Sequence, residues 1–412
     1  NNNKIFISGE HIITDTINIG NINLELHGFN STIRYSNYNN NNNSIFKCVG
    51  ATGLPGDAVN QTKKLVFKNL ILKNSAKYAI QSILYDNIEI INCTFENIGW
   101  SGDYVDTNNL NISQKIGYDS TQTEINNRIN NITSLDIVST IGCAINIYQN
   151  KNCKIQNNIF YNNYKNIVLQ DCCHSEYGLT MINNNHIYNN LSAGIILKPS
   201  ETYPAADIRN SADIDMSRNI NIYSNVIKAN GSVGLICVAG VNINIYDNNI
   251  ENNWNSGIVL WGCVESEIKN NKLFNNNRHQ TGLGFGFGIT GFNYLSQSDI
   301  YIKDSTTYIE KSFNIPTEYK FIINIINNTI IDSNTGSNNN NEKIAIYFDN
   351  ELSDISTNNN NTIKIDNNNF DKQNYAIDLS NLELNKLNSN IELFINDNNY
   401  NNIIDYPIKQ PI

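Results

Sequence analysis

The sequence predicts an all-β fold, a right-handed parallel β-helix in which about 10–12 coils stack into one solenoid with loop insertions. Three observations lead to this prediction. Asparagine recurs at a spacing close to one coil, a second apolar strand motif follows each recurrence, and Ile is abundant while Leu and Ala are scarce. Aromatic residues make up 10% of the chain and charged residues only 16%. This composition supplies β-forming and core-forming side chains and disfavours helices.

The first repeat is an asparagine, any residue, and then an apolar residue. From Asn225 to Asn248 to Asn271 the period is 23 residues, which is one coil of such a solenoid. Cys93-Thr94-Phe95 occupies one position of the series without asparagine, 24 residues after Asn69. The motif occurs at Asn69-Leu70-Ile71, Asn157-Asn158-Ile159, Asn185-His186-Ile187, Asn225-Val226-Ile227, Asn248-Asn249-Ile250, Asn271-Lys272-Leu273, Asn328-Thr329-Ile330, Asn368-Asn369-Phe370 and Asn398-Asn399-Tyr400. A second asparagine follows five residues after many of these, at Asn74, Asn162, Asn190, Asn230, Asn253 and Asn276.

A second strand is predicted in each coil from short apolar segments. Because side chains alternate between the faces of a strand, these segments place columns of Ile and Leu inside the stacked coils. They are Ala144-Ile145-Asn146-Ile147, Asn166-Ile167-Val168-Leu169, Gly194-Ile195-Ile196-Leu197, Gly234-Leu235-Ile236-Cys237, Gly257-Ile258-Val259-Leu260 and Ala376-Ile377-Asp378-Leu379.

Asparagine at a fixed place in every coil has a structural explanation. Its short amide tolerates the left-handed backbone of a tight turn and can form a hydrogen bond with the equivalent amide one coil away. We therefore interpret the recurring asparagines as a ladder that stabilises the fold, and we expect no chemistry from them.

Charge and composition limit the partners. The net charge of −10 disfavours nucleic acid, which proteins bind largely by neutralising phosphates. No apolar stretch of about 18 residues occurs, so no membrane span is expected. Eight cysteines without CxxC pairs predict mostly free, buried thiols.

The repeated N-I-x-I-x-x-N-x-I pattern, complete in Asn242-Ile243-Asn244-Ile245-Tyr246-Asp247-Asn248-Asn249-Ile250, resembles the pectin-lyase-like superfamily of right-handed parallel β-helices. The resemblance covers roughly residues 60 to 402, and the opening strands are similar to the first coils of phage tailspike depolymerases. It implies an N-terminal cap with first coils at 1–60, a β-helix at 61–402 and a tail at 403–412. The superfamily holds polysaccharide lyases, glycoside hydrolases, epimerases, virion fibres and adhesins, so the resemblance indicates the fold and leaves the reaction open.

Function is expected where the repeat is interrupted, because loops carry sites that the scaffold holds in place. Insertions are predicted near 99–141, 171–178, 199–217 and 282–319, with a smaller one near 350–360. We expect the second, third and fifth of them, together with the fourth, to follow the same strand of the coil and to line a groove.

Two of these loops hold the candidate active site. Glycoside hydrolysis needs two carboxyl groups, and Glu176 and Glu201 lie in equivalent loops of adjacent coils. The predicted catalytic residues are Glu176, Glu201, Asp207 and Asp213, and the predicted substrate-binding residues are Asp171, Tyr177, Lys198, Tyr203, Arg209 and Trp261. The alternative is that these loops are acidic only to stay solvated.

No cofactor is predicted, although oxygen donors at Asp207, Asp213 and Asp215 make calcium the one metal to consider. Adjacent Cys172 and Cys173 do not suit a tetrahedral zinc site. For a lyase or epimerase, Lys198, Arg209, Tyr177 and Tyr203 have suitable chemistry, but no lyase or epimerase motif is present.

An apolar stripe is predicted on the outer face of the second strand, formed by Val168, Ile196, Ile236, Val238, Val259 and Trp261. Such a stripe is covered either by an inserted loop or by identical chains in a homotrimer. Trp261 and Tyr148, which share this face, form an alternative sugar-stacking platform.

The leading hypothesis is a protein that binds and cleaves polysaccharide, a glycoside hydrolase or lyase of the tailspike type. Its partner is a polysaccharide or cell-surface glycan, and its location is extracellular or on a virion surface. The alternative is a non-enzymatic structural or adhesive protein, such as a virion fibre component.

Overall fold

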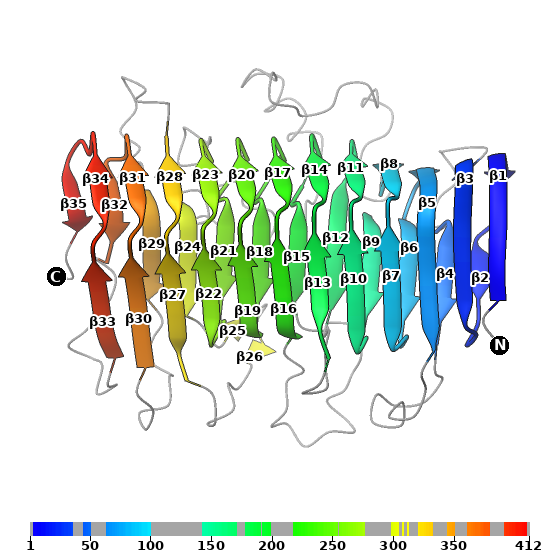
Figure 1. The fold of residues 1–412 in the computed structure, drawn as a ribbon, viewed down its shortest axis with the longest axis horizontal. Helices are drawn as coiled ribbons and strands as arrows, with labels where there is room; N and C mark the ends of the chain where they lie inside the picture. Colours follow the sequence, from blue (N-terminus) through cyan, green and yellow to red (C-terminus); the bar gives the residue numbers. More distant parts are fainter. Residues whose placement is uncertain are drawn as a thin grey trace.

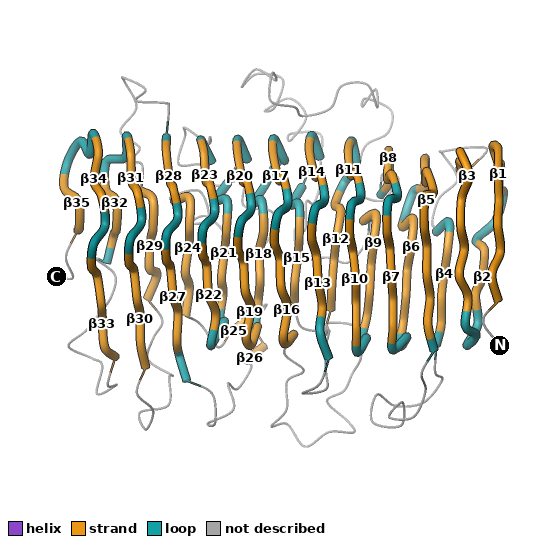
Figure 2. Tube along the Cα trace, viewed as in Figure 1, coloured by secondary structure: helices purple, strands orange, loops and turns teal. Residues whose placement is uncertain are grey.

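The computed structural model shows one elongated solenoid (Figure 1). Among the described residues, strands are the only regular secondary structure (Figure 2). The structure describes residues 3–35, 44–50, 63–99, 142–170, 178–190, 192–198, 217–253, 255–276, 298–304, 307–308, 311–312, 320–332, 344–350, 361–379 and 391–409. The predicted all-β parallel β-helix is confirmed.

The larger sheet, sheet A, contains 21 strands and forms one long face of the solenoid. Its strands are β1 (Asn3–Ile13), β3 (Leu24–Tyr35), β5 (Lys64–Ser75), β7 (Asn87–Ile91), β8 (Thr94–Ile98), β10 (Asn152–Gln156), β11 (Ile159–Tyr161), β13 (Thr180–Asn183), β14 (His186–Tyr188), β16 (Ser217–Tyr223), β17 (Val226–Lys228), β19 (Gly240–Tyr246), β20 (Asn249–Glu251), β22 (Ser266–Lys269), β23 (Lys272–Phe274), β27 (Ile322–Ile326), β28 (Thr329–Ile331), β30 (Asn361–Asp366), β31 (Asn369–Asp371), β33 (Ile391–Asn396) and β34 (Asn399–Asn401).

Sheet B contains 12 strands and forms the face behind sheet A in Figure 1. Its strands are β2 (Ile17–Ile19), β4 (Phe46–Val49), β6 (Tyr78–Ile83), β9 (Cys143–Tyr148), β12 (Lys165–Gln170), β15 (Ile195–Lys198), β18 (Leu235–Val238), β21 (Ile258–Trp261), β24 (Ser298–Asp304), β29 (Ile344–Asn350), β32 (Tyr375–Asp378) and β35 (Tyr406–Lys409). The short strands β25 (Thr307–Tyr308) and β26 (Lys311–Ser312) form an antiparallel pair outside both sheets.

One coil consists of a longer sheet A strand, a bend, a short sheet A strand, a second bend and a sheet B strand. Each strand pairs in parallel with its equivalent in the next coil, as Ile222 does with Ile245 and Ile245 with Ile268. The separation of 23 residues between these partners is the predicted period. Equivalent apolar side chains therefore stack in columns, and Ile222, Ile245 and Ile268 are all fully buried.

The asparagine ladder forms at the bend between the two sheet A strands of each coil. The backbone N–H of Asn225 and its side-chain Nδ2 both donate to Asn248 Oδ1, at 3.0 and 2.9 Å. Asn248 donates in the same way to Asn271, at 3.0 and 2.9 Å. Each Nδ2 also donates to a carbonyl of the preceding coil, for example Asn248 to Ile222 O at 2.9 Å. A second ladder at the next bend joins Asn190, Asn230, Asn253 and Asn276.

The residue before each ladder position adopts a left-handed backbone, usually as asparagine, with φ of 57° at Asn157 and 55° at Asn92. The sequence-based register was off by one residue at Asn69, Asn74, Asn157 and Asn162, whereas pairs such as Asn248-Asn249 were assigned correctly. Asn158 rather than Asn157 carries the ladder, and Asn163 rather than Asn162. Asn69 and Asn74 also occupy left-handed positions, with φ of 58° and 57°. Because both positions of the bend favour asparagine, spacing alone could not separate them.

The repeat interruptions fall at two corners of the coil. Residues 171–177, 199–216 and 351–360 each follow a sheet B strand and precede a sheet A strand. Residues 100–141 and 277–297 instead lie between a short sheet A strand and the next sheet B strand. The second, third and fifth insertions therefore leave the same corner, as predicted, whereas the fourth is divided between the two corners by β24. Both corners border sheet B.

Candidate functional site

The outer face of sheet B can be identified at its first coils. In β4, Lys47 is exposed while its neighbours Phe46 and Cys48 are buried in the core. Strand alternation therefore places Lys47 and its register partners outside. The register carries this outer column through Gln81, Asn146, Val168, Ile196, Ile236 and Val259. A second outer column, two residues further along each strand, contains Tyr148, Gln170 and Lys198, and equivalent positions hold Val238 and Trp261.

These outer-face side chains are buried within the single chain. Val168 and Val259 have no exposed surface, Ile236 is 1% exposed and Trp261 is 5% exposed. The predicted apolar stripe is therefore covered within one chain and needs no second copy to cover it. Alternation predicts which face a side chain occupies but not what lies over that face. The stripe gives no argument for packing between identical chains.

Polar side chains interrupt this covered surface over three neighbouring strands, β9, β12 and β15. Asn146, Gln170 and Lys198 are all buried, and Lys198 has no exposed surface at all. Gln170 Nε2 donates to Asn146 Oδ1 at 2.8 Å, across one coil. Tyr148 lies on the same face and is also buried. Because burying polar groups is costly, a cluster of them on a covered outer face indicates a site for polar contacts.

Asn150 lies just beyond the end of β9, at the corner where the chain turns toward β10. Its side chain is buried, and among the residues that the structure describes neither Oδ1 nor Nδ2 has a hydrogen-bond partner. An amide that presents one acceptor and two donors without partners is unusual inside a protein. Such a group is suited to contact a ligand rich in hydroxyl groups. Together Asn146, Tyr148, Asn150, Gln170, Lys198 and Trp261 are called the sheet B polar site here.

Cys143, at the start of β9, lies near the buried Lys165 and Lys198. Burial raises the pKa of its thiol to about 12, although the charges of Lys165 and Lys198 both act to lower it. Lys165 is also fully buried, with its ammonium 5.1 Å from the centre of the Tyr164 ring.

Of the predicted site residues, the structure places two, Lys198 and Trp261, and it puts both on the outer face of sheet B. The others lie outside the described residues: Glu176, Glu201, Asp207, Asp213, Asp171, Tyr177, Tyr203 and Arg209. The chain enters their segments at Asp171 and Pro199, directly after Gln170 and Lys198. These two residues are partners in neighbouring strands. The covalent starting points of the two segments are thus adjacent at one corner of the polar site.

The sequence reasoning missed Asn146, Asn150 and Gln170. A signal was available, because Asn146 and Gln170 interrupt strands that are otherwise apolar at positions predicted to face outward. Polar residues in a strand buried on both faces are rare without a partner or a function.

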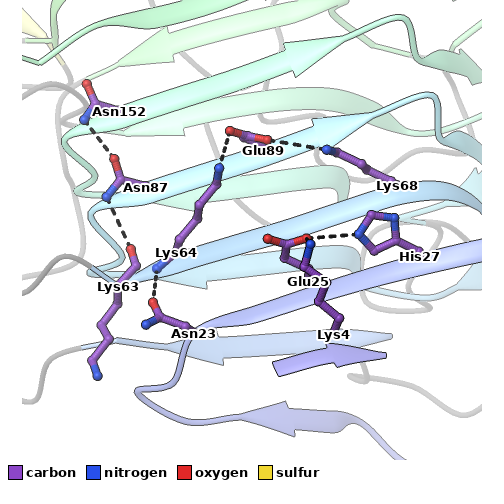
Figure 3. Close-up of polar contacts among 10 residues, drawn as sticks. All are labelled: Lys4, Asn23, Glu25, His27, Lys63, Lys64, Lys68, Asn87, Glu89 and Asn152. Carbon is purple, nitrogen blue, oxygen red and sulfur yellow. Dashed lines mark hydrogen bonds and ion pairs between the residues drawn. The ribbon is translucent and has the colours of Figure 1, made fainter. Parts of the chain in front are cut away.

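The outer face of sheet A differs from this site at its first coils, where its charges are paired (Figure 3). Glu25 contacts Lys4 Nζ and His27 Nε2, each at 3.2 Å. Glu89 contacts Lys64 Nζ at 2.6 Å and Lys68 Nζ at 3.9 Å. The hydrogen bond from His27, followed by that from Lys4, lowers the pKa of Glu25. Partly exposed pairs of this kind contribute little stability, and we assign them no catalytic role.

Within the described residues, no group of three or more His, Cys, Asp and Glu side chains is arranged to hold a metal ion. The proposed calcium ligands Asp207, Asp213 and Asp215 lie outside those residues. Six cysteines, Cys48, Cys93, Cys143, Cys153, Cys237 and Cys263, are buried as predicted, while Cys172 and Cys173 are not described. No described segment is a helix of the length and apolarity needed to cross a membrane.

A family model described as a right handed beta helix region matches residues 173–306. No curated protein sequence matches the chain. Among solved structures, a surface adhesin of Streptococcus pneumoniae, PfbA, is 12% identical, with a TM-score of 0.49 and coverage of 98% of this chain and 85% of the adhesin.

The Azotobacter vinelandii mannuronan C-5 epimerase AlgE6 A-module is 11% identical, with a TM-score of 0.38 and coverage of 100% and 92% of the two chains. Tailspike protein 3 of bacteriophage CBA120 is 10% identical, with a TM-score of 0.41, and the match covers 96% of this chain and 56% of the tailspike chain. At these identities the likeness concerns the β-helix architecture alone, and function must be argued from the site.

Proposed function

We propose that this chain binds a polysaccharide on the outer face of sheet B. The observation that carries the proposal is the buried polar site, and above all the Asn150 amide, which has no partner in the protein. Ligand sites are typically apolar surfaces with a few precisely placed polar groups. The covered column of Val168, Ile196 and Ile236 beside Gln170 and Lys198 has that composition.

A glycan suits this surface for two reasons. Amides and an ammonium group supply the donors and acceptors that sugar hydroxyls require. Tyr148 and Trp261 supply aromatic rings, whose apolar faces can contact sugar C–H groups. A nucleic acid is disfavoured by the net charge of −10.

The experiment that tests binding uses Lys198→Met, which keeps most of the side-chain volume and removes the charge. Affinity for the best ligand of a glycan panel should fall about tenfold or more, because a buried charged hydrogen bond contributes about 1.5–3 kcal/mol. Lys154→Met, on the half-buried outer surface of sheet A, is the matched control and should bind like the parent. Equal affinity of the two variants would exclude the sheet B polar site as the binding surface.

Cleavage of the bound polysaccharide is the second part of the proposal. Glu176 and Glu201, supported by Asp207 and Asp213, would supply the general acid and the second carboxylate of a glycosidase. Asp171, Tyr177, Tyr203 and Arg209 would contact the substrate beside Lys198 and Trp261. What supports this assignment is that both segments begin at adjacent strand ends, Gln170 and Lys198.

Glu176→Gln and Glu201→Gln test the cleavage step. Each variant should stop the release of new reducing ends from the bound glycan while binding persists. Undiminished release in both variants would rule out these carboxyl groups as the catalytic pair.

A non-enzymatic adhesive or virion-surface protein is the alternative within the same proposal, at an extracellular or virion location. Binding without any release of reducing ends by the parent protein would select it. A homotrimer would be detected by light scattering. Ile236→Asp is not a test of that assembly, because Ile236 is 1% exposed in the single chain and the substitution would disrupt the fold itself.

A further inference from the structure

Asparagine followed by any residue except proline and then by Ser or Thr is the acceptor tripeptide for N-linked glycosylation. Within the described residues, such tripeptides begin at Asn30, Asn92, Asn190, Asn230 and Asn327. Composition explains why an asparagine-rich chain contains them, but the fold places them in two different environments. Three begin at exposed bends, and two begin inside a ladder.

The exposed set occupies equivalent places at the bend of sheet A. Asn30, Asn92 and Asn327 are all exposed and have left-handed backbones, with φ of 47°, 55° and 56°. Each stands one residue before the ladder position. The side-chain Nδ2 of Asn92 donates to Asn69 Oδ1, at 3.3 Å, on the exposed surface. The hydroxyl-bearing residues Thr32, Thr94 and Thr329 are half-buried rather than enclosed.

The ladder set is enclosed between coils. Asn190 has no exposed surface and Asn230 is 2% exposed. Asn190 Nδ2 donates to Asn230 Oδ1 at 2.8 Å, and Asn230 Nδ2 donates to Asn253 Oδ1 at 2.9 Å. Asn190 Oδ1 in turn accepts from the backbone N–H of Asn163 at 2.9 Å. The nitrogen that would carry a sugar is thus the nitrogen that joins successive coils.

We infer that the fold admits N-glycans at Asn30, Asn92 and Asn327 and excludes them at Asn190 and Asn230. In the transfer, the asparagine Nδ2 forms a bond to the anomeric carbon of a lipid diphosphate-linked oligosaccharide. The amide loses one proton, and the lipid diphosphate leaves. At the exposed bends the new substituent points away from the ladder. At Asn190 or Asn230 it would remove a donor hydrogen and separate two coils.

This sorting has two consequences. Glycans at the permitted positions lie at the bends of sheet A and not on sheet B. Modification of a ladder tripeptide during synthesis, before the coils stack, would stop the solenoid from closing at that point. Passage through a glycosylating secretory pathway therefore lowers the yield of folded protein.

The test expresses the full chain behind a cleavable secretion signal in a cell line with N-glycosylation. Site occupancy is mapped in the secreted and retained pools by glycosidase release in ¹⁸O-water and peptide mass spectrometry. A Ser192→Ala/Ser232→Ala variant removes both ladder tripeptides and keeps their asparagines. Ser232 Oγ has no hydrogen-bond partner, so its loss should not itself disturb folding. A Thr32→Ala/Thr94→Ala/Thr329→Ala variant is the matched control for the exposed set.

The secreted parent should carry glycan on at least one of Asn30, Asn92 and Asn327 and none on Asn190 or Asn230. Glycan on the ladder asparagines should appear only in the retained pool. The Ser192/Ser232 variant should then be secreted about threefold or more better, and the threonine variant should lose glycan without gaining yield. Secreted, folded protein with glycan on Asn190 or Asn230 would overturn the inference. So would the absence of glycan from all three exposed positions in both pools.

Discussion

The solenoid buries polar side chains in two regions, the asparagine ladders of the bends and the sheet B polar site, and the two regions use them differently. In the ladder, Asn248 accepts from one coil and donates to the next, and the same pattern runs from Asn158 to Asn398. In the sheet B polar site, Gln170 and Asn146 share one hydrogen bond, and Asn150 has no partner. The amides of the ladder form hydrogen bonds with one another, whereas the Asn150 amide of the sheet B polar site stays available to a ligand.

Whether a buried amide is paired within the protein distinguishes a structural role from a binding role. A buried amide that is fully paired stabilises the native state, and removing it strands its partners. A buried amide without a partner lowers stability, and a protein retains such a group where function requires it. Substitutions in the two regions should therefore change stability in opposite directions.

The largest effect is expected for Asn248→Ala in the ladder. It would remove the acceptor of the Asn225 N–H, one of the three acceptors of Asn225 Nδ2 and the donor to the carbonyl of Ile222. Each stranded buried group costs about 1–3 kcal/mol, so the loss should be about 3 kcal/mol or more. Denaturant unfolding measures it. The control is Asn249→Ala, one residue further on and half-buried, which should unfold close to the parent midpoint. Similar losses in both variants would contradict a ladder role.

Asn150→Ala should act in the opposite direction. Removal of a buried amide without partners should raise the free energy of unfolding by about 1 kcal/mol. Affinity for the glycan identified with the parent protein should fall about fivefold, since the ligand loses one hydrogen-bonding group. Unfolding and binding are measured on the same preparation. A loss of stability on the scale of Asn248→Ala would place Asn150 with the structural amides instead.

A smaller change is expected for Cys93→Asn, which fills the one ladder position held by a thiol. The Cys93 N–H already donates to Asn158 Oδ1 at 2.8 Å, and its Sγ points at Phe67 O, 3.6 Å away. An asparagine there has an acceptor in place, so stability should stay within about 1 kcal/mol of the parent. Cys48→Asn is the contrast, because Cys48 is buried in the core outside the ladder. It should lose about 2 kcal/mol or more. Equal thermal melting of the two variants would refute the assignment.

The smallest effect is a pH dependence confined to the first coils. Because hydrogen bonds from His27 and Lys4 lower the pKa of Glu25 in the folded protein, the pair stabilises at pH values above the carboxyl's unfolded pKa. This contribution is lost as the pH falls through the lowered folded value. Hydrogen exchange from about pH 6 to about pH 3 should show reduced protection of β1 and β3, while the amide ladder at β17 and β20 does not titrate. Glu25→Gln should remove this dependence of protection on pH in β1 and β3. An equal loss of protection along the solenoid would contradict it.

Much of the fold could be predicted from the sequence because the ladder places asparagine at the same position in most coils. The period from Asn225 to Asn248 to Asn271, the second ladder and the place of Cys93 in the series all follow from that demand. The register failed only at the bends of Asn69, Asn74, Asn157 and Asn162, where two neighbouring positions both favour asparagine or where an apolar residue takes the ladder position.

Less of the candidate site could be predicted. Trp261 and Tyr148 were predicted to face outward and Lys198 to contact substrate, and the structure places all three on the outer face of sheet B. Asn146, Asn150 and Gln170 were missed. Strand alternation, which the sequence records, determined the face on which each side chain lies. Only the tertiary structure decided that the outer face of sheet B is covered, because burial depends on what lies over a surface and not on the local pattern that forms it.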